Sequence, residues 1–164
     1  MRRLICFAPL LLSACGLHPL YSDGAHGTIG KFFGSVDVQG IEGKSGYLMH
    51  QALTDRLGEG KVGETRYRLE TTLDDKIVGT GITTSNLVTR ERRALRARFH
   101  LVDVQTGLVV LDATAGSDES VDVVGSEYAT IAAESTALER LSDVVADQIV
   151  SRIATFATHQ MKGQ

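Results

Sequence analysis

The sequence predicts an α+β fold, a two-layer sandwich in which a four-stranded sheet carries two helices on one face in the order β-α-β-β-β-α. Three observations predict it. Four segments alternate apolar and polar residues with a period of two, which is typical of half-buried strands. Two segments repeat apolar residues every three or four positions, as amphipathic helices do. The chain has 164 residues, and even without a 14-residue signal it has the size of one domain, about 100 to 200 residues.

The N-terminus has the order of regions found in secretory signal peptides. Two arginines are followed by an apolar run at positions 4–12 and then by small residues. The run is too short to cross a bilayer, which takes about 20 residues. The tetrapeptide Leu12-Ser13-Ala14-Cys15 resembles the lipobox of bacterial lipoproteins. We therefore expect residues 1–14 to be removed and Cys15 to carry the acyl chains that anchor the protein to a membrane.

Loss of the signal fixes the thiol content and the charge of the mature protein. Cys6 leaves with the signal and Cys15 is acylated, so no free thiol remains for disulfides, zinc or catalysis. Of 17 basic and 20 acidic side chains, two basic ones are lost, and the formal charge falls from −3 to −5. This acidic balance does not indicate a nucleic-acid binder.

The first half of the mature chain predicts a tether, a strand and a helix. Residues 15–30 are rich in glycine without hydrophobic period, which is typical of a tether, and the single domain is expected at 31–158. Alternation over 32–41 predicts the first strand. Ser45 is the expected N-cap of a helix whose Met49, Leu53 and Leu57 recur every four residues before a glycine ends it.

The next segments predict an antiparallel meander. Residues 66–76 show the clearest alternation, a polar loop follows at 79–86, and the third strand is expected at 87–104. A short turn containing Gly107 then predicts a hairpin with a fourth strand at 108–115. Core-facing positions of the third strand are Leu95, Ala97, Phe99 and Leu101.

A long amphipathic helix is expected to complete the domain. Ser126 is its predicted N-cap, and residues 159–164 are expected to fray. Its expected buried face consists of Ile131, Leu138, Leu141, Val145, Ile149, Ile153 and Phe156.

No motif in the chain predicts an enzyme, a cofactor or a metal site. The segment Gly40–Ser45 lies where a phosphate-binding P-loop would lie, but Val38 occupies the position of its first glycine. The five histidines lack metal-ligand spacing, and no nucleophile elbow is present. The carboxylates Asp118, Glu119 and Asp122 are expected in a solvated loop after the fourth strand.

A row of arginines on the third strand is the strongest candidate for a binding site. Arg90, Arg92, Arg96 and Arg98 share the parity opposite to the core residues, so we expect them to project from the open face of the sheet. Guanidinium groups bind phosphate through paired hydrogen bonds, which makes the row a candidate phosphate site. The alternative is a solvated face paired with Glu70, Asp74 and Asp112, and the sequence leaves both open.

The mature start, Cys15-Gly16-Leu17-His18-Pro19-Leu20-Tyr21, resembles the Cys-Gly-Phe-x-Pro-Leu-Tyr start of the LptE family of lipopolysaccharide-assembly lipoproteins. The element order and the long terminal helix extend this resemblance. It implies a lipid-anchored protein on the periplasmic side of the outer membrane that plugs the LptD β-barrel, assists its assembly and helps to pass lipopolysaccharide to the outer leaflet. The arginine row would then contact lipopolysaccharide phosphates.

A second function class shares the same signal and can share the fold. Small outer-membrane auxiliary or pilot lipoproteins of other transport or secretion systems bind only another protein. Recovery with a large β-barrel favours the LptE family, whereas recovery with a periplasmic transport bridge favours the alternative.

Overall fold

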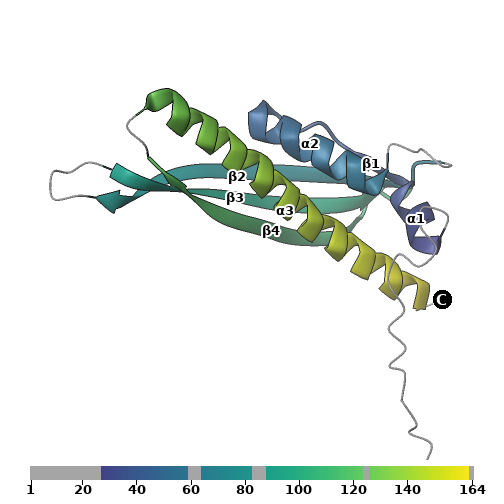
Figure 1. Cartoon of the computed structure of the whole chain (residues 1–164). Helices are drawn as coiled ribbons and strands as arrows, with labels where there is room; N and C mark the ends of the chain where they lie inside the picture. The colour runs from purple at the N-terminus through teal and green to yellow at the C-terminus, as the bar shows by residue number, and fades with distance from the viewer. Residues whose placement is uncertain (1–26, 59–63, 83–87, 124–125, 163–164) are drawn as a thin grey trace, which may run out of the picture.

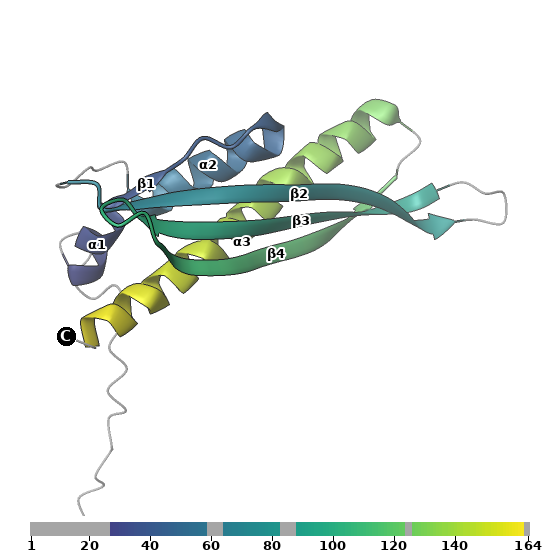
Figure 2. The same cartoon turned by 180° about the vertical axis from the view of Figure 1, so that it is seen from behind.

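The computed structural model describes residues 27–58, 64–82, 88–123 and 126–162 and shows the predicted two-layer α+β fold. A four-stranded sheet forms one layer, and helices α2 and α3 pack against each other on one of its faces (Figure 1). The view from behind shows the other face of the sheet uncovered by helices (Figure 2). The elements are α1 (Thr28–Phe33), β1 (Val36–Val38), α2 (Gly43–Leu57), β2 (Tyr67–Ile82), β3 (Val88–Asp103), β4 (Val109–Asp122) and α3 (Glu127–Lys162).

The strands lie in the sheet in chain order, β1-β2-β3-β4. Strands β2, β3 and β4 form the predicted antiparallel meander. The short β1 pairs parallel with the start of β2, because α2 returns the chain to the same end of the sheet. Gly107, with φ +69°, lies in the β3–β4 turn. In this turn the Asp103 carboxylate accepts hydrogen bonds from the backbone N–H groups of Gln105 and Thr106.

Two strands continue further than their apolar pattern predicts. β2 runs through Ile82 into the segment expected as a loop, and β4 runs to Asp122 rather than ending at Ala115. Both extensions keep the pairing with β3, with register shifts only at Gly79/Gly81 and Gly81/Ile82. Backbone hydrogen bonds to a long neighbour therefore hold the extensions although their side chains are largely polar.

The segment before α2 differs from the expected strand at 32–41. Its first part is helix α1, which starts inside the expected tether, and β1 covers only three residues. Phe32 stacks against Tyr67 with ring centroids 4.9 Å apart and lies 6.2 Å from Phe156. These aromatic rings close one end of the core, which explains why Phe32 is not a strand residue.

Helix α2 begins three residues earlier than predicted. Its N-cap is Glu42, without a side-chain capping bond, and Ser45 lies inside the first turn. The expected core positions Met49, Leu53 and Leu57 are all buried. Gly46 is buried as well, because α2 packs directly on the backbone of Ile41.

The hydrophobic core lies between the helices and the half of the sheet nearest α1. On β3 the four predicted core residues, Leu95, Ala97, Phe99 and Leu101, are buried. From α3 the core receives Leu138, Leu141, Val145, Ala146, Ile149, Val150, Ile153 and Ala154.

Helix α3 is 36 residues long, which corresponds to about 54 Å, and its first turns contribute nothing to this core. Ile131, expected on the buried face, is 52 % exposed. The first buried residue of α3 is Ala137. At its other end the helix continues to Lys162, beyond position 159 where fraying was expected. Among the described residues, no helix combines the length and apolar character needed to cross a membrane.

Polar side chains lie beneath the first half of α3. Arg93 makes two hydrogen bonds to the Asp75 carboxylate, of 2.9 and 2.6 Å, and a third of 2.8 Å to the backbone oxygen of Glu134. Burial, together with the neighbouring Glu134 carboxyl, raises the pKa of Glu91. The first turns of α3, before the buried Ala137, are therefore joined to the sheet by polar contacts.

Candidate functional site

The arginine row lies on the open face of the sheet. Arg90, Arg92, Arg96 and Arg98 are between 51 % and 63 % exposed at their side chains. Their pairing with β4 runs without a register shift from Arg90 to Leu101, so no β-bulge turns part of the row toward the helices. Arg93, of opposite parity, points to α3 instead.

Each of the four arginines pairs with an aspartate of β4. Arg90 lies 2.9 Å from Asp122, Arg92 and Arg96 lie 3.5 and 2.8 Å from Asp118, and Arg98 lies 3.0 Å from Asp112. His100 is 3.2 Å from the same Asp112 carboxylate. Every arginine of the row therefore has an anionic partner within the protein.

These partners differ from the expected ones in two ways. Asp118 and Asp122 belong to β4 and not to a loop, because the strand is 14 residues long. Glu119, between them, faces the helices and pairs with Arg140 at 3.0 Å. Of the expected partners only Asp112 pairs with the row, whereas Glu70 and Asp74 bind Arg68 and Lys76 of their own strand.

The face therefore carries alternating charges rather than an unbroken basic strip. The hydrogen bond from Arg96 lowers the pKa of Asp118, and that from Arg98 lowers the pKa of Asp112. Both carboxylates are thus ionised well below neutral pH.

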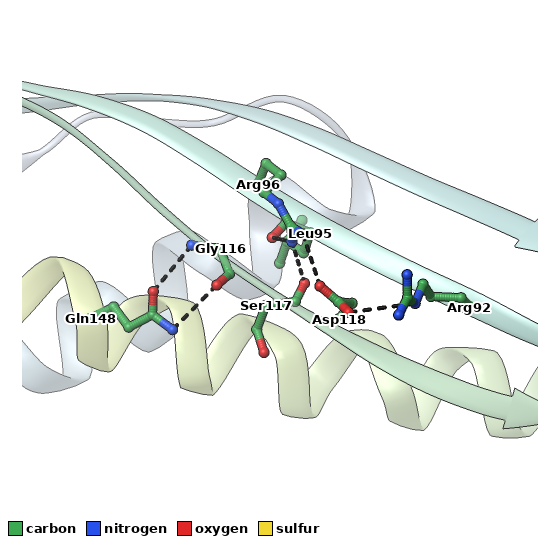
Figure 3. Close-up of polar contacts among 7 residues, drawn as sticks. All are labelled: Arg92, Leu95, Arg96, Gly116, Ser117, Asp118 and Gln148. Carbon is green, nitrogen blue, oxygen red and sulfur yellow. Dashed lines mark hydrogen bonds and ion pairs between the residues drawn. The ribbon is translucent and has the colours of Figure 1, made fainter.

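Arg96 has a structural role that the other three arginines do not share (Figure 3). Its side chain lies across Gly116, where an added Cβ would stand 2.4 Å from the Arg96 Cδ atom. From there its Nη1 donates to the backbone oxygens of Leu95 and Ser117, at 3.2 and 2.7 Å, and its Nη2 donates to Asp118 at 2.8 Å. Gly116 provides the space that allows Arg96 to clamp β3 to β4.

The outer edge of β4 is bound at the same glycine by helix α3. The amide oxygen of Gln148 accepts from the Gly116 N–H at 3.1 Å, and its nitrogen donates to the Gly116 carbonyl at 3.3 Å (Figure 3). A side chain thus satisfies both outward backbone groups of the edge strand at this point.

A concavity of about 610 Å³ lies beside this cluster. It is open to solvent and brings Arg152 of α3 near Arg96 and Arg98, together with the hydroxyls of Thr72 and Thr114. Its donors could hold an anionic group the size of a phosphate.

The other candidate residues are not brought together into a site. Gly43 and Lys44 start α2, and Lys44 Nζ donates to Ser135 at 3.0 Å, so this segment is a helix start on the helix layer. Within the described ranges, no three His, Cys, Asp or Glu side chains are grouped as metal ligands. Cys15 and the signal at 1–14 lie outside the described residues.

Comparison with known proteins places this architecture. Residues 33–153, which span all four strands and α2, match the sequence model of the lipopolysaccharide-assembly family LptE. No curated protein matches the sequence significantly.

Similar solved structures are lipoproteins and show the same fold at low identity. A putative lipoprotein from Caulobacter crescentus CB15 is 23 % identical with a TM-score of 0.68, covering 82 % of this chain and 98 % of its own. The rare lipoprotein B from Shewanella oneidensis is 11 % identical with a TM-score of 0.60, covering 77 % and 96 %. The uncharacterized lipoprotein B from Nitrosomonas europaea is 11 % identical with a TM-score of 0.58, covering 79 % and 86 %.

The family match covers most of the chain, and the fold of these three structures agrees with it. The chain belongs to the LptE family of lipopolysaccharide-assembly proteins.

Proposed function

We propose that this protein is a lipoprotein anchored through Cys15 to the periplasmic side of the outer membrane, where it serves lipopolysaccharide assembly by binding rather than by catalysis. The family match over residues 33–153 is the observation that carries this proposal. The signal and lipobox support the anchor, and Gly16 after the cysteine lacks the aspartate that marks inner-membrane retention in many lipoproteins.

We further propose that its protein partner is an LptD-type β-barrel, which it fills as a plug and whose assembly it assists. The body supports such a role because two helices and a sheet form one narrow, elongated layer pair (Figure 1). A lipid on Cys15 would hold this body at the membrane that contains the barrel.

Co-purification tests the partner. The acylated protein, extracted in mild detergent, is expected to carry a large outer-membrane β-barrel in a stable complex, and its intact mass is expected to show acyl chains on Cys15. The Cys15→Ser protein is the control and should remain an unprocessed precursor. Recovery with a periplasmic transport bridge and no barrel would instead favour an auxiliary lipoprotein of another system.

The open face supplies a candidate site for the lipid. We propose that Arg90, Arg92, Arg96 and Arg98 contact lipopolysaccharide phosphates, with Arg152 contributing from the neighbouring concavity. The row is exposed, and Arg90 and Arg92 each meet their aspartate through Nε, at 2.9 and 3.5 Å. A guanidinium carries five N–H donors, so further donors of these side chains can reach an external anion.

Charge removal on the row tests the lipid site. The triple variant Arg90→Gln, Arg92→Gln, Arg98→Gln keeps the Arg96 clamp and is expected to bind purified lipopolysaccharide about tenfold more weakly, mainly at low salt. Its thermal midpoint should change little, because exposed ion pairs contribute only about 0 to 1 kcal/mol each.

The matched control removes three cations elsewhere. Lys31→Gln, Lys44→Gln, Arg140→Gln changes the net charge equally but leaves the open face intact. Equal affinity of the two triple variants would assign the arginine row to solvation or to contact with a protein.

A further inference from the structure

We propose that the β4 aspartates, Asp118 above all, are internal competitors that occupy the arginine row in the absence of a phosphate and so keep its affinity low enough for release. This inference rests on the proposed phosphate role of the row. It assigns to three carboxylates a part in regulating the same site.

The register of the sheet places the aspartates where an external anion would bind. Asp122 is directly opposite Arg90, and Asp112 is diagonal to Arg98. Asp118 is opposite Ala94, the one position in the row that has no long side chain, and is therefore diagonal to both Arg92 and Arg96. The Asp118 carboxylate fills the gap that Ala94 leaves between two guanidinium groups.

The contacts of Asp118 are those a phosphate would make. One carboxylate oxygen accepts from Arg96 at 2.8 Å, and the other lies 3.5 Å from the Nε of Arg92 (Figure 3). A carboxylate and a phosphate present similar oxygens to the same guanidinium donors. Because the two anions would share these donors and repel each other, binding of a phosphate between Arg92 and Arg96 requires Asp118 to move away.

Displacement of the aspartates from the arginines costs little free energy. All four arginine–aspartate ion pairs lie on the open face, and exposed pairs of this kind stabilise a protein only weakly. The Asp118 side chain is 34 % exposed, and those of Asp112 and Asp122 are 48 % and 70 % exposed, so each can turn into solvent. The hydrogen bonds from the arginines lower the pKa of Asp118 and of Asp112, which keeps these competitors charged throughout the neutral range.

Such competition is useful to a surface that must both bind a lipid and release it. Several arginines acting on a multiply charged lipid would bind it tightly, and tight binding slows dissociation. As the phosphate leaves, the aspartates return to the guanidinium groups. This exchange makes the net free energy of phosphate binding less favourable and keeps the face ordered. The row can then select phosphorylated lipid and still release it.

The variant Asp118→Asn tests the inference. Asparagine keeps the shape and an oxygen acceptor for Arg96 but removes the competing charge. The affinity of the acylated protein for purified lipopolysaccharide is expected to rise about three- to tenfold, as two exposed ion pairs are released. The gain should shrink with enzymatically dephosphorylated lipopolysaccharide.

The control Asp147→Asn removes the same charge on the helix layer, where Asp147 pairs with Arg56 at 2.6 Å. An equal gain in both variants would show an effect of net charge only and would overturn the inference. Asp112→Asn repeats the test at Arg98, should Asp118→Asn prove unstable. If the arginine triple variant loses affinity while neither aspartate variant gains any, the phosphate site stands and the competition fails. If the arginine triple variant binds like its control, the proposed site itself fails.

Discussion

Arg93→Leu is expected to lower the free energy of unfolding by about 3 kcal/mol, because it leaves acidic side chains without a cation beneath α3. The Arg93 and Asp75 side chains are only 12 % and 19 % exposed, and they are joined by two hydrogen bonds. Arg93 also holds the Glu134 backbone oxygen and so ties α3 to the sheet. Loss of the partner of a buried charge costs more than the pair contributes when intact.

The pH dependence of stability in this region follows from Glu91, which lies two residues before Arg93 on β3. Burial and the Glu134 carboxyl raise its pKa in the folded state. A raised carboxyl pKa means that stability is fully present below the unfolded pKa and is lost as pH rises through the folded pKa. Arg93 is not among the causes of the Glu91 shift, so stability should fall from pH 4.5 to pH 7 by a similar amount in the wild type and in Arg93→Leu.

Denaturant unfolding at both pH values measures these effects, with a thermal midpoint lower by about 10 °C as a second readout. The matched control is the double variant Arg93→Leu, Asp75→Leu, which replaces the pair by apolar side chains and should recover much of the loss. A double variant as unstable as Arg93→Leu would show that the arginine acts mainly through Glu134.

Gly46→Ala is expected to destabilise the protein by about 2 kcal/mol, although alanine favours helices over glycine by about 1 kcal/mol. A Cβ at position 46 would stand 2.4 Å from the carbonyl oxygen of Ile41 and 2.6 Å from its carbon. These are backbone atoms and cannot rotate away, so α2 or the segment before it would have to shift.

Gly40→Ala is the control for this prediction. A Cβ at position 40 meets nothing within 4 Å, so this variant should be close to neutral. Equal unfolding free energies for the two variants would mean that α2 shifts without loss of packing.

The parts of the fold that could be predicted are those whose side-chain pattern is set by the core. The three apolar residues of α2 and the four core residues of β3 repeat with the period of their element and are buried as expected. The short turn with Gly107 predicted the β3–β4 hairpin for the same local reason.

The parts that could not be predicted depend on distant contacts. The final residues of β4 include few apolar side chains, and they form a strand because β3 is long enough to pair with them. Phe32 belongs to a helix because Tyr67 and Phe156, far along the chain, receive its ring. Ile131 continues the helical period of α3 but extends past the apolar core.

The candidate site shows the same division. Strand parity predicted the side of the sheet on which the arginines lie, but not their partners, because pairing with Asp118 requires the β3–β4 register. A signal was present in the sequence: Asp112, Thr114, Asp118, Ser120 and Asp122 share one parity, which indicates a strand continuing beyond Ala115. Gly116 and Gln148 carry no such signal, since their roles arise only where α3 meets the edge of β4.

The closed edge at Gly116 bears on how this protein would meet the barrel chain proposed as its partner. A β-barrel polypeptide has unpaired strands until its first and last strands join, and an open sheet edge elsewhere would offer them a false partner. Gln148 already holds the N–H and carbonyl of Gly116, so β4 offers no free backbone donor or acceptor at this residue. A barrel strand approaching at this point would meet side chains rather than free backbone groups, which leaves its own backbone groups for pairing within the barrel.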